Sequence, residues 1–164
     1  MKHYGDITKL SGYDLPPVDI ITGGSPCQDL SVAGKRAGLA GERSGLFMEQ
    51  MRIVKEMRDN DVRNNGRADW DVRPRFLIWE NVPGATSSSG GADFQAVLEE
   101  IIKIIRKEIP PIPIPKDGWP RAGSICGMGD NGIPFSVAWR QHDARAVRTH
   151  RDVEVRSRAV EVAV

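Results

Sequence analysis

Two short apolar runs in the chain have the length and composition of buried β-strands. The first covers residues 18–21 and stops at Gly23 and Gly24, and the second covers residues 76–79 and ends at Glu80. Runs of this length, bounded by glycine or polar residues, are typical of strands inside a sheet. The apolar residues between positions 133 and 139 predict a further short strand.

Two longer segments repeat their apolar residues at steps of three and four, which predicts helices packed on the sheet. Ser44 is a suitable N-cap for the first helix and Asp93 for the second. The apolar face of the first is formed by Leu46, Phe47, Met51, Ile53, Val54 and Met57. The face of the second is formed by Phe94, Val97, Leu98, Ile101, Ile102, Ile105 and Ile109. Strands that alternate with helices in this way indicate an α/β fold.

The segments between these elements are polar or rich in proline. Residues 1–17 form a polar N-terminal segment before the first predicted strand. Residues 59–73 are charged and rich in asparagine, so we expect them to form a surface connection. Prolines recur through residues 110–120, which predicts an extended linker that acts as a plain spacer. Residues 145–164 mix basic and apolar side chains without a single period.

Length and composition limit the number of domains and the type of protein, but they do not indicate a specific function. Its 164 residues fit one domain, and its net charge of +1 gives no global attraction to a polyanion, so any nucleic-acid contact must come from local patches. The two cysteines have no disulfide spacing, and no signal peptide or membrane-length apolar run is present, which predicts the reducing cytoplasm. His3, His142 and His150 lack metal-ligand spacing, so we expect no metal.

Cys27 follows the first predicted strand in the sequence S-P-C-Q. The carboxyl ends of strands are where open α/β sheets gather their ligands, so this position suits a nucleophile. Gly23 and Gly24 allow a turn and a close approach of a ligand, and Pro26 restricts the backbone. The alternative is a buried free cysteine in a tight turn.

Three segments together resemble the DNA (cytosine-5) methyltransferases. They are P-C-Q at Cys27, F-L-I-W-E-N-V-P-G at residues 76–84 and G-D-I-T at residues 5–8, in the order that the family has them. The resemblance covers residues 5–143 and implies part of a Rossmann-like S-adenosylmethionine-dependent methyltransferase sheet with flanking helices. It divides the chain into a partial catalytic domain at residues 1–143 and a divergent basic C-terminal tail at residues 144–164.

The resemblance also implies roles for individual residues. Cys27 would be the nucleophile and Glu80 the acid held against ring nitrogen 3 of the target cytosine, where the end of an apolar strand would partly desolvate it. S-adenosylmethionine would be the methyl donor, bound by Asp6, Ile7, Pro26 and Leu46. Duplex DNA would be contacted by the glycine-rich loop after the cysteine, through Gln28, Ser31, Lys35, Arg36 and Arg43.

Simpler alternatives exist for three of these features. Asp6 can serve as a turn residue after Gly5, and Glu80 can form a structural ion pair with an arginine. The basic residues of the glycine-rich loop can be a solvated surface. These readings remain open on the sequence alone.

Several family segments are missing from the sequence. No F-x-G-x-G segment precedes Gly5, and the family's Q-x-R-x-R is replaced at its expected place by R-D-V-E-V at residues 151–155, with Arg148 or Arg151 as possible substitutes. One hypothesis is a truncated or frame-shifted piece of a longer methyltransferase. Another is a DNA-binding subunit that a partner methyltransferase chain complements. A third, an unrelated thiol enzyme, needs a histidine base near Cys27.

Overall fold

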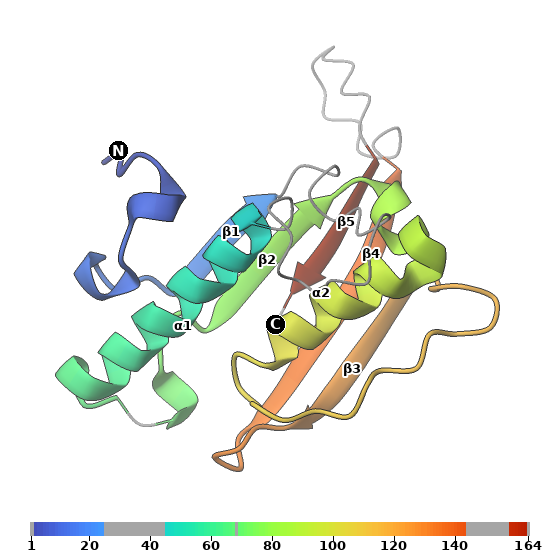
Figure 1. The fold of residues 1–164 in the computed structure, drawn as a ribbon. Coiled ribbons are helices and arrows are strands. Elements are labelled where there is room, and N and C mark those ends of the chain that lie inside the picture. Colours follow the sequence, from blue (N-terminus) through green and yellow to red (C-terminus); the bar gives the residue numbers. More distant parts are fainter. Residues whose placement is uncertain (1, 25–44, 68, 144–157, 164) are drawn as a thin grey trace, which may run out of the picture.

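A mixed five-stranded sheet with two helices against one face forms the body of the protein (Figure 1). The computed structural model describes residues 2–24, 45–67, 69–143 and 158–163. The strands are β1 (Ile20–Gly24), β2 (Phe76–Asn81), β3 (Ala122–Met128), β4 (Pro134–Asp143) and β5 (Arg158–Ala163), and the helices are α1 (Gly45–Asn65) and α2 (Ala92–Ile102). The spatial order is β1-β2-β5-β4-β3. The α/β class predicted from the sequence is confirmed.

The strands β1 and β2 are parallel, and α1 lies between them in the sequence. Parallel neighbours need such a crossover, because a short hairpin cannot return the chain to the same end of the sheet. The register places Ile20 beside Phe76 and Gly24 beside Glu80. The carboxyl ends of the two motif-bearing strands therefore meet at one edge of the sheet.

Aromatic side chains fill the layer between the sheet and the helices. Phe47 of α1 packs edge-on against Trp79 of β2, with ring centroids 6.0 Å apart. Phe94 of α2 makes the same kind of contact with Trp139 of β4 at 5.8 Å. Both helices therefore hold the sheet through buried aromatic pairs, a geometry that adds to the gain from burying apolar area.

The first predicted helix is confirmed and longer than its apolar face suggested. Phe47, Met51, Ile53, Val54 and Met57 are buried, as expected from their spacing. The helix continues to Asn65, so the expectation of a surface connection from residue 59 is wrong over its first part. The proposed cap Ser44 lies outside the described residues.

The second helix is shorter than predicted and has a different cap. Gly91, with φ 93°, is the N-cap, whereas Asp93 is buried in the first turn and accepts a hydrogen bond from Ser89 at 3.1 Å. The helix ends at Ile102, and beyond it the backbone N–H groups of Ile104 and Ile105 donate to the carbonyls of Ile101 and Ile102, three residues back, as in a tightened last turn. Ile109 still packs on the core from the segment beyond the helix.

The proline-rich segment contains no helix or strand, as predicted, but it makes a turn in which the N–H of Gly118 donates to the carbonyl of Pro115, and it is more than a spacer. The indole Nε1 of Trp119 donates to the backbone carbonyl of Gly91 at 2.8 Å, and its ring lies edge-on to Phe94 with centroids 5.3 Å apart. The backbone N–H of Ile112 donates to Glu99 of α2 at 2.9 Å. These contacts fasten the segment along α2.

Two strands, β3 and β5, were not predicted from the sequence. β3 presents Gly123, Ile125 and Gly127 to the helix side, where an added Cβ on either glycine would collide with Trp139 or Phe135. Because two of these three inward positions are glycines, the sequence lacks the apolar alternation that marks a strand. β5 lies between β2 and β4 and pairs with both, so residues 158–163 of the expected tail form an interior strand of the sheet.

A buried ion pair joins the end of α1 to the approach to β2. Asp61 is only 1% exposed and accepts hydrogen bonds from the backbone N–H of Arg73 at 2.8 Å and from its guanidinium at 3.0 Å. Asn65 adds a third donor at 2.6 Å. Burial by itself raises the pKa of this carboxyl, but the bonds from Arg73 and Asn65 outweigh it and lower the pKa to about 2.

We expect this carboxyl to make the protein less stable in acid. A pKa that is lower in the folded state stabilises the fold above the unfolded value, near 3.8, and the contribution is lost as the pH falls toward 2. The free energy of unfolding should fall by about 2 kcal/mol more in the wild type than in Asp61→Asn between about pH 5 and about pH 2. Denaturant titrations at both pH values measure this, and parallel pH profiles would contradict it.

Candidate active site

Glu80, the described member of the predicted catalytic pair, lies at the carboxyl end of β2, beside the end of β1. Gly24, the last residue of β1, stands beside Glu80, and a Cβ added to Gly24 would lie 3.0 Å from the Glu80 carbonyl oxygen. The two backbones therefore run close together at this point. The predicted site residues that lie outside the described part of the chain are Pro26, Cys27, Gln28, Ser31, Lys35, Arg36 and Arg43.

Glu80 points away from the helices. Its neighbours Trp79 and Asn81 are buried, whereas Glu80 is exposed, as strand alternation requires. The expected partial desolvation is therefore wrong for the described structure, because no described element covers this face of β2 at its end. Within the described ranges, no arginine forms an ion pair with Glu80, so that alternative gains no support from them.

The loop after Glu80 is fixed by polar contacts. Asn81 is buried, and its Oδ1 accepts the backbone N–H of Val82 at 2.8 Å. Gln141, near the end of β4, donates to the hydroxyl of Thr86 at 2.8 Å. The first bond is local to the E-N-V segment, and the second joins the loop that follows it to β4.

A cavity of about 250 Å³ opens beside the same edge of the sheet. It is lined by Ile7, Ile21, Thr22, Gly23, Gly24, Leu46, Gln50 and Ile53. Ile7 comes from the N-terminal segment, Leu46 from the first turn of α1, and the glycines from the end of β1. The structure thus brings together two of the residues predicted to bind the cofactor, although they are far apart in the sequence. Leu46, one of the lining residues, is 43% exposed.

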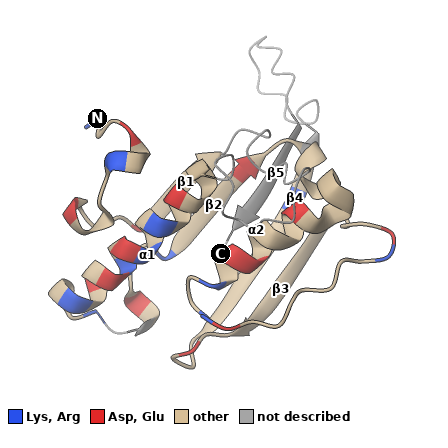
Figure 2. Ribbon diagram, viewed as in Figure 1, with Lys and Arg blue, Asp and Glu red and all other residues tan. Residues whose placement is uncertain are grey.

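Charged side chains of α1 hold the N-terminal segment in place. Figure 2 shows both signs of charge along this helix. Arg52 donates to the backbone carbonyls of Ile7 at 3.1 Å and Leu10 at 2.9 Å, and it is paired with Glu49 and Glu56. Glu56 in turn accepts the backbone N–H of Gly12 at 2.7 Å. Ile7 is therefore positioned against the cavity by contacts to its own backbone and to the turns that follow.

Asp6 takes the turn role that the sequence left open. It is the N-cap of the short 3-10 helix Ile7–Lys9, and its Oδ1 accepts both the backbone N–H of Thr8 at 3.0 Å and the Thr8 hydroxyl at 2.8 Å. These bonds lower the pKa of the exposed Asp6 carboxyl. Asp6 does not line the cavity, although it adjoins Ile7, which does.

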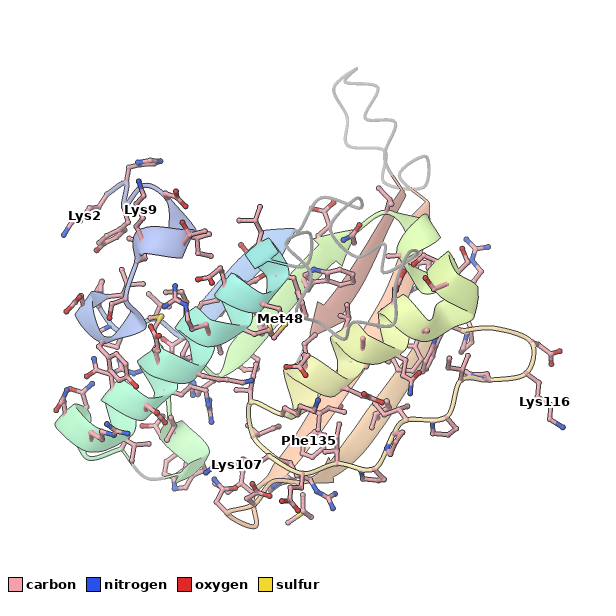
Figure 3. The ribbon with its side chains drawn as sticks, viewed as in Figure 1. Lys2, Lys9, Met48, Lys107, Lys116 and Phe135 are labelled. Atoms are coloured by element: carbon pink, nitrogen blue, oxygen red, sulfur yellow. The ribbon has the colours of Figure 1, made fainter. Side chains whose placement is uncertain are left out.

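Gln50 is a member of this site that the sequence reasoning missed. It lies one helical turn after Leu46, on the buried face of α1, and is 7% exposed. Met48, in contrast, lies on the side of α1 toward α2 (Figure 3). A polar residue at an apolar position of a helix is a signal that sequence alone can give, because such a position normally holds a hydrophobic side chain.

None of the helices in the described part of the chain is long and apolar enough to span a membrane. Nor does that part of the chain bring three or more His, Cys, Asp or Glu side chains close enough to hold a metal ion.

Similarity to known proteins agrees with this arrangement of motifs. Residues 1–104 match the model of the C-5 cytosine-specific DNA methylase family. The Type II methyltransferase M.BsuFI of Bacillus subtilis is 32% identical over 100 residues, which are 61% of this chain and 21% of that protein. M1.ScrFI of Lactococcus lactis subsp. cremoris is 36% identical over 98 residues, 60% of this chain and 21% of that protein.

A third relative is named for methylation of adenine instead of cytosine. The DNA N-6-adenine-methyltransferase of Escherichia phage P1 is 34% identical over 92 residues, 54% of this chain and 11% of that protein. The chain spans about a fifth of the length of the first two relatives. Because the family model covers more than half of its residues, the chain belongs to the C-5 cytosine-specific DNA methylase family.

Proposed function

We propose that this chain carries the catalytic thiol and acid of an enzyme that transfers a methyl group from S-adenosylmethionine to carbon 5 of cytosine in DNA. The observation that carries the proposal is the parallel register of β1 and β2, with Gly24 beside Glu80. Cys27 is three residues from Gly24, and chain connectivity alone keeps their Cα atoms within about 11 Å. The Rossmann-like arrangement of the whole enzyme is part of this proposal.

The thiol starts the reaction. Carbon 5 of cytosine is a poor nucleophile, so the Cys27 thiolate adds to carbon 6, which breaks the aromatic system and makes carbon 5 an enamine carbon. Glu80, as a carboxylic acid, gives its proton to ring nitrogen 3 as negative charge develops there. Loss of the carbon 5 proton after methylation, with return of the proton from nitrogen 3, expels the thiolate and restores the ring.

The cavity beside β1 fits the adenine part of S-adenosylmethionine. Ligand sites typically have volumes of roughly 300–1,000 Å³, so a cavity of about 250 Å³ suits part of such a ligand. Ile7 and Leu46 supply apolar contacts for a flat ring, with Pro26 and Asp6 proposed at its margin. When bound, S-adenosylmethionine supplies the sulfonium methyl group.

DNA is the proposed substrate, and the target base must leave the duplex before the thiol can reach its ring. The contacts are assigned to the segment after Cys27, which is rich in glycine and basic residues. We assign the contacts to the DNA phosphates, and to the gap that the flipped base leaves in the duplex, to five residues of this segment. They are Gln28, Ser31, Lys35, Arg36 and Arg43.

The cysteine favours cytosine over adenine as the target. The exocyclic nitrogen of adenine is itself the atom that takes the methyl group in N6 methylation, so no covalent addition to the ring is needed there. A thiol placed beside the acid of the E-N-V segment is useful only where carbon must be made nucleophilic.

A second candidate function is a truncated, inactive or complementing DNA-binding fragment of such an enzyme. The observation behind it is that the chain spans about a fifth of the length of the relatives it matches. Methyl transfer that appears only after addition of a partner chain would identify the complementing form.

Trapping with 5-fluorocytosine tests the role of Glu80. Duplex DNA containing this base blocks the final proton loss, so the covalent adduct accumulates in the presence of S-adenosylmethionine. We expect Glu80→Gln to slow adduct formation about a hundredfold or more, because the amide cannot give a proton to nitrogen 3. The rate of appearance of the adduct on denaturing gels measures this.

Glu108→Gln is the matched control, since Glu108 is exposed and lies beyond the end of α2. This variant should form the adduct at the wild-type rate. Equal rates for Glu80→Gln and the wild type would remove Glu80 from the mechanism. An unmodified wild-type chain would leave only the fragment hypothesis.

A further inference from the structure

The side-chain amide of Gln50 is buried without a partner for its nitrogen. Its Nε2 has no hydrogen-bond partner, and it is the only buried side-chain nitrogen or oxygen in the described residues of which this is true. The amide lies over Gly23, where an added Cβ would be 2.5 Å from Nε2. The absence of a side chain at Gly23 is therefore what makes room for the amide.

A buried donor of this kind requires an explanation. Buried polar groups in folded proteins are nearly always paired, and an unpaired one is destabilising. Asp61, the other deeply buried polar group of α1, has several donors around it. Among the described residues, the side chains that line the cavity with Gln50 are apolar apart from Thr22, so they offer few acceptors.

We infer that Gln50 is a cofactor-binding residue whose amide N–H donates to an acceptor nitrogen of the adenine ring. This inference rests on the proposed function, which puts adenine between Ile7 and Leu46. Gln50 lines the same cavity and lies one turn along the helix from Leu46. The terminal torsion of a glutamine is soft, so the amide turns into the cavity without movement of the helix. Adenine presents ring nitrogens 1, 3 and 7 as acceptors.

The experiment pairs protein variants with ligands that each lack one acceptor. Calorimetry measures the binding of S-adenosylhomocysteine and its 1-deaza, 3-deaza and 7-deaza analogues to the wild type and to Gln50→Met. We expect the wild type to bind one of the three analogues about tenfold more weakly than the parent, the effect of one hydrogen bond. Gln50→Met, which keeps the length but lacks the donor, should bind that analogue and the parent within about twofold.

Two controls separate binding from folding. Gln95→Met makes the same chemical change on α2, where Gln95 donates to Glu99 at 3.0 Å, and it should keep the wild-type preference. The unfolding midpoint of unliganded Gln50→Met should equal or exceed that of the wild type, because the unpaired donor has gone. A purely structural Gln50 would instead lower the midpoint.

The outcomes distinguish failure of the proposed cofactor pocket from failure of the role assigned to Gln50. If the wild type binds none of the ligands, the cofactor pocket of the proposed function fails and this inference with it. If the wild type binds them and Gln50→Met keeps the preference for the parent, the inference alone is overturned. Equal weakening of all four ligands by Gln50→Met overturns it too, since that pattern reflects a change in the shape of the pocket.

Discussion

Replacing Cys27 with alanine is expected to abolish the covalent adduct with 5-fluorocytosine DNA altogether. The adduct is a bond between sulfur and carbon 6 of the base, so removal of the sulfur leaves nothing to form it. The loss should be complete within detection, in contrast to the slowing expected for Glu80→Gln. Mass spectrometry of the intact protein after incubation with S-adenosylmethionine and the modified duplex measures the fraction bound to DNA.

The second cysteine is the matched control. Cys126 is a free, exposed thiol on β3, at the opposite edge of the sheet from β1. Cys126→Ala should therefore form the adduct as the wild type does. Adduct that survives in Cys27→Ala, or disappears in Cys126→Ala, would show that the nucleophile has been assigned to the wrong residue.

The largest effect on folding is expected at Asp61. Its replacement by alanine leaves the Arg73 guanidinium, 19% exposed, and the Arg73 backbone N–H without their acceptor. Removing an acceptor from buried donors costs about 1–3 kcal/mol, and more where a donor is charged, because the donors are left unpaired. Urea denaturation near neutral pH should show a loss of this size in the free energy of unfolding.

Asp59 provides the comparison on the same helix. It is exposed and lies 3.7 Å from Arg63, an arrangement that contributes at most about 1 kcal/mol. Asp59→Ala should therefore change stability little. The double variant Asp61→Leu, Arg73→Met should recover much of the loss, because neither charge is then buried alone. A loss below about 1 kcal/mol for Asp61→Ala would refute the structural role of the pair.

Apolar spacing was sufficient to predict the parts of the fold that bury large side chains. It located β2 and the core face of α1 because Leu77, Trp79, Phe47 and Met51 follow strand and helix periods. It missed β3, whose inward positions include Gly123 and Gly127 opposite bulky rings. Cross-strand complementarity of this kind depends on a partner that a single strand does not reveal.

Polar residues with buried roles were the other source of error. Asp61 sits in a stretch of charged residues that suggests a surface, yet Arg73, twelve residues later, pairs with it inside the fold. Nothing in local periodicity connects the two positions. Gln50 could have been found as a polar residue on the apolar face of α1, although its unpaired nitrogen is visible only in three dimensions.

Some features of the candidate site could likewise be predicted from the sequence, and others could not. Motif order predicted that Ile7 and Leu46 share a pocket, and the structure brings both side chains to one cavity. The exposure of Glu80 was not predicted, because it depends on which strands and helices cover the end of β2. The roles of Cys27 and of the basic residues after it remain predictions from the sequence.

A crystal structure of the adduct with 5-fluorocytosine DNA tests most directly whether thiol and acid act on one base. The account predicts a bond from the Cys27 sulfur to carbon 6 and a Glu80 carboxyl oxygen about 3 Å or less from nitrogen 3 of the same ring. A trapped base whose nitrogen 3 is held by another group, with Glu80 on the far side of the sheet, would contradict it.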